Sequence, residues 1–163
     1  MVLFLERAQN PRERKTERGT FALFTLAPSI YVTRCIGHLE DEHVDLLIAY
    51  STPLVRNAPR PIEVFHEWTE MTGYTPSCRH RITAWALQNR RAYERVHVSV
   101  KSKLVKMGVQ VVNIALGNIV AYDSAPALQV AIRTALRAHG ADVDAASPDS
   151  IAPATVRRSK PPI

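Results

Sequence analysis

The sequence predicts an α/β domain whose elements follow the order β-β-α-β-α-β-α-β-α. Three observations point to this class: short runs rich in β-branched and aromatic residues recur along the chain, longer amphipathic segments separate most of them, and capping or turn residues stand at the junctions. Such alternation is typical of a largely parallel sheet with right-handed crossovers. We therefore expect a mostly parallel five-stranded sheet with helices packed on it.

The first two strands are adjacent in the sequence. The runs TFALFTLAP (20–28) and SIYVTRCIG (29–37) meet at Pro28, which favours a hairpin or a tight corner and so adds an antiparallel strand at one edge of the sheet. Acidic residues open the helical segment 38–59, where they suit the positive end of the helix dipole. Pro53 lies inside this segment and is expected to kink or divide the helix.

A polar loop separates the third strand from the second helix. The strand PIEVFHEW (61–68) is followed by this loop, which ends at Thr75, the expected N-cap of a helix over 76–93 that has proline in its first position. Ser102 and Ser124 are expected to cap the last two helices. The remaining elements are a strand at 95–102, a helix at 103–116, a strand at 119–122 and a helix at 124–140.

Composition sets the expected limits of the domain. With 163 residues, nearly half of them apolar, the chain has the size of one globular unit. The two ends have too few large apolar residues to offset the entropy of ordering. We expect a mobile charged N-terminal segment at 1–19, a folded domain at 20–140 and a disordered C-terminal tail at 141–163.

The sequence also bounds the location and the partners. It has no apolar run of about 18 residues and no signal-peptide core, so we expect a cytoplasmic protein that does not span a membrane. Cys35 and Cys78 belong to no Cys-x-x-Cys pair and are expected to be reduced thiols. The net charge of +6 is uneven, with acids over 40–45 and bases over 79–106. The absence of a nucleic-acid-binding signature disfavours nucleic acid as a partner.

Two motifs carry a resemblance to a known family. The stretches VFHEWTEMTGY (64–74) and VHVSVKSKLVKMGVQVVNIALG (96–117), together with the element order, resemble the SpoIIAA-like (STAS/SEC14-type) uncharacterised bacterial proteins. The wider STAS fold includes anti-sigma-factor antagonists and the cytoplasmic domains of sulfate transporters, and the likeness covers about residues 20–139. It implies a non-catalytic protein-binding or regulatory module of bacterial signalling. Its SEC14-like branch implies an alternative, a carrier of a lipid or small apolar ligand.

The resemblance also raises the question of a phosphorylation switch. In the antagonists a serine near the N-terminus of the second helix, in a D-S-x-G loop, is phosphorylated to control partner binding. The corresponding stretch HEWTEMTGYTPSC (66–78) lacks that order, so Thr72, Thr75 and Ser77 are the candidates. A phosphate there would be favoured by the helix N-terminus and by Arg79 and Arg81, which lie one turn further on. The simpler interpretation is that Thr75 caps the helix and Ser77 is exposed in its first turn.

Catalysis is a third interpretation of the same stretch. His66, Glu67, Cys78 and His80 lie where a strand end faces a helix N-terminus, the place at which open sheets bind ligands. A metal site requires three or four convergent ligands, and the other histidines show no ligand spacing. No nucleophile elbow, phosphate loop or dinucleotide fingerprint is present. We therefore expect that the protein is not an enzyme and binds no cofactor or metal. The least favoured alternative is a hydrolase or metal enzyme that uses His66 and Glu67.

The predicted binding surface joins the 67–78 loop, the N-terminus of the second helix and the basic start of the third. Lysines at a helix N-terminus oppose the helix dipole, so they form either a solvated rim or a docking patch for an acidic protein surface or an anionic lipid headgroup. The expected partner is a protein or a second copy of this chain. The candidates on this surface are His66, Glu67, Trp68, Thr72, Tyr74, Arg79, Lys101, Lys103 and Lys106.

Overall fold

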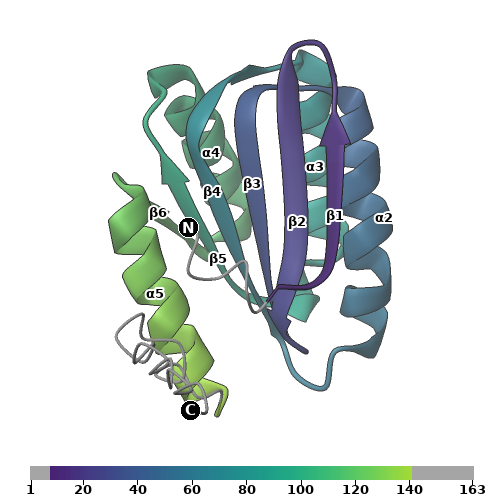
Figure 1. Ribbon diagram of the computed structural model, residues 1–163, viewed down its shortest axis with the longest axis vertical. Helices are drawn as coiled ribbons and strands as arrows, with labels where there is room; N and C mark the ends of the chain where they lie inside the picture. The colour runs from purple at the N-terminus through teal and green to yellow at the C-terminus, as the bar shows by residue number, and fades with distance from the viewer. Residues whose placement is uncertain (1–7, 141–163) are drawn as a thin grey trace, which may run out of the picture.

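Figure 1 shows the protein as a computed structural model, which describes residues 8–140. The predicted tail at 141–163 lies outside the described residues. None of the helices within 8–140 is long and apolar enough to cross a membrane. The elements are β1 (Gln9–Lys15), β2 (Gly19–Ala27), β3 (Ile30–Leu39), α2 (Asp41–Asn57), β4 (Ile62–Tyr74), α3 (Pro76–Gln88), the 3-10 turn η1 (Arg90–Ala92), β5 (Tyr93–Val100), α4 (Lys103–Leu116), β6 (Ile119–Tyr122) and α5 (Ala125–Ala138).

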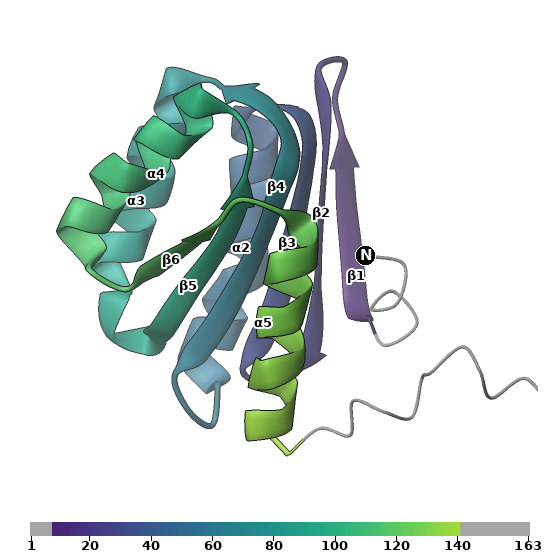
Figure 2. The same cartoon turned by 90° about the vertical axis from the view of Figure 1, so that its left-hand side faces the viewer.

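The six strands form one sheet in the order β1-β2-β3-β4-β5-β6. The pairs β1/β2 and β2/β3 are antiparallel, and β3 to β6 are parallel. Because each parallel strand is added on the same side of the previous one, right-handed crossovers carry α2, α3 and α4 to one face of the sheet. The last helix, α5, follows the final strand and lies against the opposite face (Figure 2).

Strand β1 corrects the expected strand count. The prediction of five strands is one short, because residues 9–15 of the segment expected to be mobile pair antiparallel with β2, from Gln9 opposite Thr25 to Lys15 opposite Thr20. All seven residues of β1 are exposed. An exposed, charged edge strand is held by backbone hydrogen bonds and carries no apolar alternation. Composition therefore could not reveal it.

Several elements differ from their expected form; α3, expected over 76–93, ends at Gln88 and is followed by η1. The expected polar loop after residue 68 is a continuation of β4, which pairs with β3 as far as Tyr74 opposite Leu39. Met71 and Gly73 are buried in this extension while Thr72 is exposed, as in a strand with one covered face. Pro53 does not divide α2, which continues to Asn57.

The predicted caps of the last two helices are confirmed. Ser102 Oγ accepts a hydrogen bond from the amide of Val105 at 3.5 Å, and Ser124 Oγ accepts one from Ala127 at 3.3 Å. Gly117 ends α4 in the left-handed conformation, with φ at 72°. A residue in this conformation lets the last carbonyl groups of the helix accept hydrogen bonds, and glycine adopts the conformation without steric cost. These local signals placed α4 and α5 correctly.

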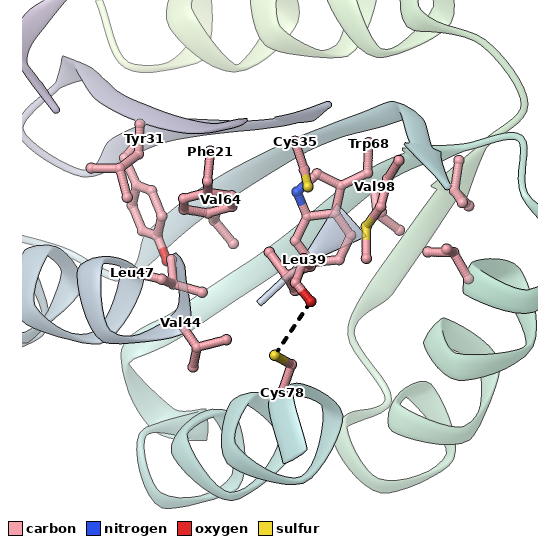
Figure 3. Packing of buried hydrophobic residues seen from close by; sticks show 14 of the residues in the cluster. Phe21, Tyr31, Cys35, Leu39, Val44, Leu47, Val64, Trp68, Cys78 and Val98 are labelled. Carbon is pink, nitrogen blue, oxygen red and sulfur yellow. Dashed lines mark hydrogen bonds between the residues drawn. The ribbon is translucent and has the colours of Figure 1, made fainter. Parts of the chain in front are cut away.

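A separate apolar core lies on each face of the sheet. The larger one fills the space between the sheet and α2, α3 and α4, where Figure 3 shows Phe21, Trp68 and Val44 among its members. The smaller core lies between the sheet and α5. Cys35 and Cys78 are both free and buried in the larger core, and Cys78 Sγ donates to the Leu39 carbonyl oxygen at 3.6 Å (Figure 3). Two cores mean that neighbouring residues of a central strand belong to different environments.

Candidate functional site

Strand alternation separates two of the predicted site residues. His66 and Trp68 face the α3 and α4 side of β4, whereas Glu67 lies between them in the chain and faces the opposite side. Glu67 is 4% exposed, and its carboxylate lies 3.2 Å from Nε of Arg34. His66 and Glu67 therefore do not converge on one site. The predicted surface that contains both is not continuous.

The other predicted surface residues lie near the C-terminal ends of the neighbouring parallel strands β4 and β5 and near the starts of α3 and α4. Thr72, Arg79, Lys101 and Lys103 are exposed, and the ammonium group of Lys106 pairs with Asp123 at 2.9 Å. Lys101 and Lys103 form no ion pair with any residue that the structure describes. Both therefore present unpaired positive charge at the start of α4.

Tyr74 packs against α4. A Cβ atom built on Gly108 would lie 2.8 Å from the Tyr74 hydroxyl oxygen, closer than real side chains approach. The glycine, which lowers helix propensity by about 1 kcal/mol relative to alanine, is explained by this close approach. Tyr74 thus contributes to the packing of α4 against the sheet.

Ser77 joins the N-termini of α2 and α3. Its hydroxyl donates to both carboxylate oxygens of Asp41, at 2.8 and 3.0 Å, and Arg81 donates to the same carboxylate at 3.2 Å. The hydrogen bonds from Ser77 and Arg81 lower the pKa of Asp41. Ser77 therefore connects the start of α3 to the start of α2 through a hydrogen bond. A phosphate on Ser77 would place a second anion beside Asp41. Thr75, at the N-cap, donates its backbone N–H to Leu39 at 3.0 Å and makes no side-chain cap bond.

An apolar cavity of about 90 Å³ lies between the sheet and helices α3 and α4. A second cavity, of about 60 Å³, lies beside it and shares Trp68, Ile82, Val109 and Val112 as lining residues. Sequence periodicity could not show either space, because both depend on how far the helices stand from the sheet. The larger cavity is lined by Tyr31, Leu47, Val64, His66, Trp68, Ile82, Trp85, Ala86, Arg90, Tyr93, Val96, Val98, Val109, Val112, Leu116, Asn118 and Ile119.

His66 is a polar residue in the wall of this cavity. Its Nδ1 atom lies 2.7 Å from Thr33 Oγ1, which also accepts a hydrogen bond from Trp68 Nε1 at 3.1 Å. Its ring stacks on that of Trp68, with centroids 4.5 Å apart. Burial, with a smaller contribution from His97, lowers the pKa of His66 to about 3. The imidazole is therefore neutral at physiological pH.

A second polar cluster, which the sequence analysis missed, lies on the α5 face. His97 Nδ1 lies 2.9 Å from the Tyr122 hydroxyl, its Nε2 lies 3.1 Å from Glu63 Oε2, and His139 Nε2 lies 3.3 Å from Glu63 Oε1. Burial lowers the pKa of His97 although Glu63 opposes the shift. The alternation in VHVSV (96–100) was the available sequence signal for this cluster, because it places His97 on the opposite face of the strand from its valine neighbours.

The outer face of α4 carries an apolar stripe of four exposed side chains. Leu104, Met107, Val111 and Ile114 are spaced by three or four residues and are 56%, 64%, 56% and 87% exposed. This spacing places them along one side of a helix.

No group of three or more His, Cys, Asp or Glu side chains able to hold a metal ion occurs in the part of the chain that the structure describes.

Comparison with solved structures identifies the fold. One similar structure is an uncharacterised protein of the DUF3478 family with a SpoIIAA-like fold from Shewanella loihica PV-4, with 12% identity, a TM-score of 0.52, and coverage of 74% of this chain and 90% of that chain. Another is the anti-sigma factor antagonist SpoIIAA in its unphosphorylated form, with 14% identity, a TM-score of 0.55, and coverage of 71% of this chain and 96% of that chain. No family model and no curated protein matches the sequence significantly. At this identity the likeness concerns the fold alone, and it confirms that the protein has the SpoIIAA-like, STAS-type fold.

Proposed function

We propose that the protein is a non-catalytic binding module of STAS type that recognises a protein partner through the outer face of α4. The observation that carries this proposal is the apolar stripe of Leu104, Met107, Val111 and Ile114. A contiguous row of large exposed apolar side chains is uncommon on a monomeric surface and is typical of a contact site. A helix face of this kind fits an apolar groove or another helix.

Charge at one end of the stripe defines the partner further. Lys101 and Lys103 add unpaired positive charge to the positive end of the α4 dipole. A partner whose apolar contact surface is edged by Asp or Glu near this end complements both features. A second copy of α4 does not supply those acids, because the helix sequence KLVKMGVQVVNIAL contains none. The chemistry therefore favours a different protein with an acidic rim.

The first step of the test is to identify the partner at the surface itself. A photo-crosslinking amino acid at position 107 is expected to capture a protein in the source cells, while the same group at position 130 on α5 does not. Val130 is a matched control because it is 63% exposed and Met107 is 64% exposed. Equal capture from both positions would contradict the proposal.

The second step measures binding of the captured protein after purification. We expect Ile114→Glu to weaken binding at least tenfold, and Val130→Glu to change it less than about twofold, since a buried charge at the centre of an apolar contact is costly. Higher salt should weaken binding through Lys101 and Lys103. If the protein forms a dimer that dissociates in the Ile114→Glu variant, the stripe is instead a contact between two copies of this chain. Flotation with phosphatidylglycerol vesicles that is lost with the same change would assign it to a membrane surface.

A further inference from the structure

We infer that the cavity between the sheet and helices α3 and α4 binds a small uncharged molecule, mostly apolar, that accepts one hydrogen bond from Nε2–H of His66. This site is distinct from the proposed docking stripe. Val109 and Val112 line the cavity on the inner side of α4, whereas Ile114 is on the exposed side of the same helix. Failure of one proposal therefore leaves the other open to its own test.

The first argument is that the space is lined almost entirely by apolar side chains. It reaches the surface beside the exposed Arg90, so a ligand that covered this lining would remove apolar area from water. His66, which is partly buried, adds a polar group to the apolar wall. An apolar hollow with few polar groups in its wall is typical of a small-molecule site.

The second argument is the direction of the hydrogen bonds around His66. Trp68 Nε1 can only donate, so Thr33 Oγ1 accepts from it at 3.1 Å. We assign the hydroxyl proton of Thr33 to His66 Nδ1, 2.7 Å away, because this hydroxyl has no other acceptor among the described residues. With Nδ1 as an acceptor, the proton of the neutral imidazole resides on Nε2.

The third argument is that this proton has no acceptor. His66 Nε2 forms no hydrogen bond with any residue that the structure describes, although the side chain lines the cavity. Asn118, another lining residue, has a buried Oδ1 atom that is also unpaired. Nε2 of His66 is not one of the fully buried atoms that lack a partner, so it is accessible to a small molecule. The relay through Thr33 thus presents one oriented N–H donor to an apolar space.

The size of the space limits the ligand. An apolar cavity of roughly 150 Å³ admits benzene, and the cavity of about 90 Å³ here adjoins a second one of about 60 Å³. A short branched chain fits the first cavity, a six-membered ring requires both cavities, and a phospholipid fits neither. Because His66 is neutral and the walls are apolar, the favoured polar group is a carbonyl, ether or similar neutral acceptor. The exposed guanidinium of Arg90 lies among the lining residues and is the one cation there.

The test uses a pair of probes with nearly the same shape. Cyclohexanone offers a carbonyl oxygen where methylenecyclohexane has a CH2 group. In NMR titrations of the full chain we expect cyclohexanone to shift the methyl signals of Val98 and Val109 and the Nε2–H signal of His66, and to bind about tenfold more tightly than the alkene. Equal affinities, or no binding of either probe up to its solubility limit, would overturn the inference.

Variants separate the donor from the space. His66→Phe keeps a ring in the wall and removes the donor, so the preference for the ketone should disappear. His80→Phe, at an exposed position of α3, should retain it. If His66→Phe does not fold, Thr33→Val serves instead, because it removes the relay, and nitrogen NMR of the imidazole should then show a loss of the Nε2–H preference. An unchanged ketone preference in His66→Phe, or tighter binding of cyclohexanecarboxylate at Arg90, would also overturn the inference.

Discussion

His66 and His97 lie on neighbouring strands of the same sheet and have opposite environments. Val98 is opposite His66 and Phe65 is opposite His97, so the two imidazoles project from opposite faces. Under α5, His97 has both ring nitrogens within hydrogen-bond distance of a partner, and its ring stacks on Phe65 at 4.3 Å. Under α3 and α4, His66 has one nitrogen paired and the other facing a cavity.

This difference distinguishes a structural residue from a candidate site residue. Burial lowers the pKa of both histidines, so the shift alone does not separate them. What separates them is whether each donor and acceptor is satisfied within the fold. The His97 cluster ties α5 to β4 and β6, whereas the His66 relay ends at an open position.

The largest expected effect comes from replacing each histidine with phenylalanine. His97→Phe removes the partner of the Tyr122 hydroxyl and one of the two partners of the Glu63 carboxylate, which is 13% exposed and keeps His139, so we expect it to lower the free energy of unfolding by about 3 kcal/mol. His66→Phe breaks one hydrogen bond, between Nδ1 and the Thr33 hydroxyl, and removes a second nitrogen that has no partner among the described residues, so we expect a smaller loss of about 1 kcal/mol. Urea unfolding of both variants checks this. Equal losses would remove the distinction between the two faces.

The next largest effect is on the pH dependence of stability. The pKa of His66 is about 3 in the folded protein and about 6.5 in an unfolded chain. Between these values the unfolded state binds a proton that the folded state does not, so stability falls as the pH drops from 6.5 toward 3 and is unaffected by this group above 6.5.

We expect His66 to account for about 2 kcal/mol of stability lost between pH 7.5 and pH 5. Urea unfolding at the two pH values should show a loss that is smaller by this amount in His66→Phe than in the wild type. The lowered pKa values of His43 and His97 leave a residual dependence in the variant. An identical pH dependence in both proteins would contradict the burial of a neutral His66.

A smaller effect tests how closely α4 packs against Tyr74 of β4. In Gly108→Ala the new methyl group would meet the Tyr74 hydroxyl at 2.8 Å. We expect a net loss of about 1 kcal/mol, because the clash outweighs the gain in helix propensity. Adding Tyr74→Phe should recover stability beyond the single variant, since the hydroxyl is the atom in the way. Thermal unfolding of the single and double variants measures this, and a more stable Gly108→Ala alone would contradict the close contact.

The smallest expected effect is on the outer side of the same helix. Ile114→Glu should change the free energy of unfolding by less than about 0.5 kcal/mol, because the side chain is 87% exposed and loses little packing. Urea unfolding beside the partner-binding measurement separates stability from recognition. A loss above about 1 kcal/mol would show that the stripe supports the fold instead of a contact.

Local chemistry in the sequence determined much of the architecture. Serines at 102 and 124, glycine at 117 and alternating apolar runs define where α4, β6 and α5 begin or end, because capping and periodicity act over a few residues. The same signals gave the α/β class and the parallel part of the sheet. They could not reveal β1, whose charged residues are ordered by backbone pairing with β2.

Only the tertiary structure decided which residues meet. The sequence places His66 beside Glu67, and the pleat of β4 sends them to opposite faces. Glu63 and His139 are 76 positions apart, yet they share a hydrogen bond because α5 returns across the sheet. The cavity beside His66 depends on the distance between two layers, which no local pattern encodes. Elements follow from short-range preferences, whereas sites follow from long-range packing that joins distant segments.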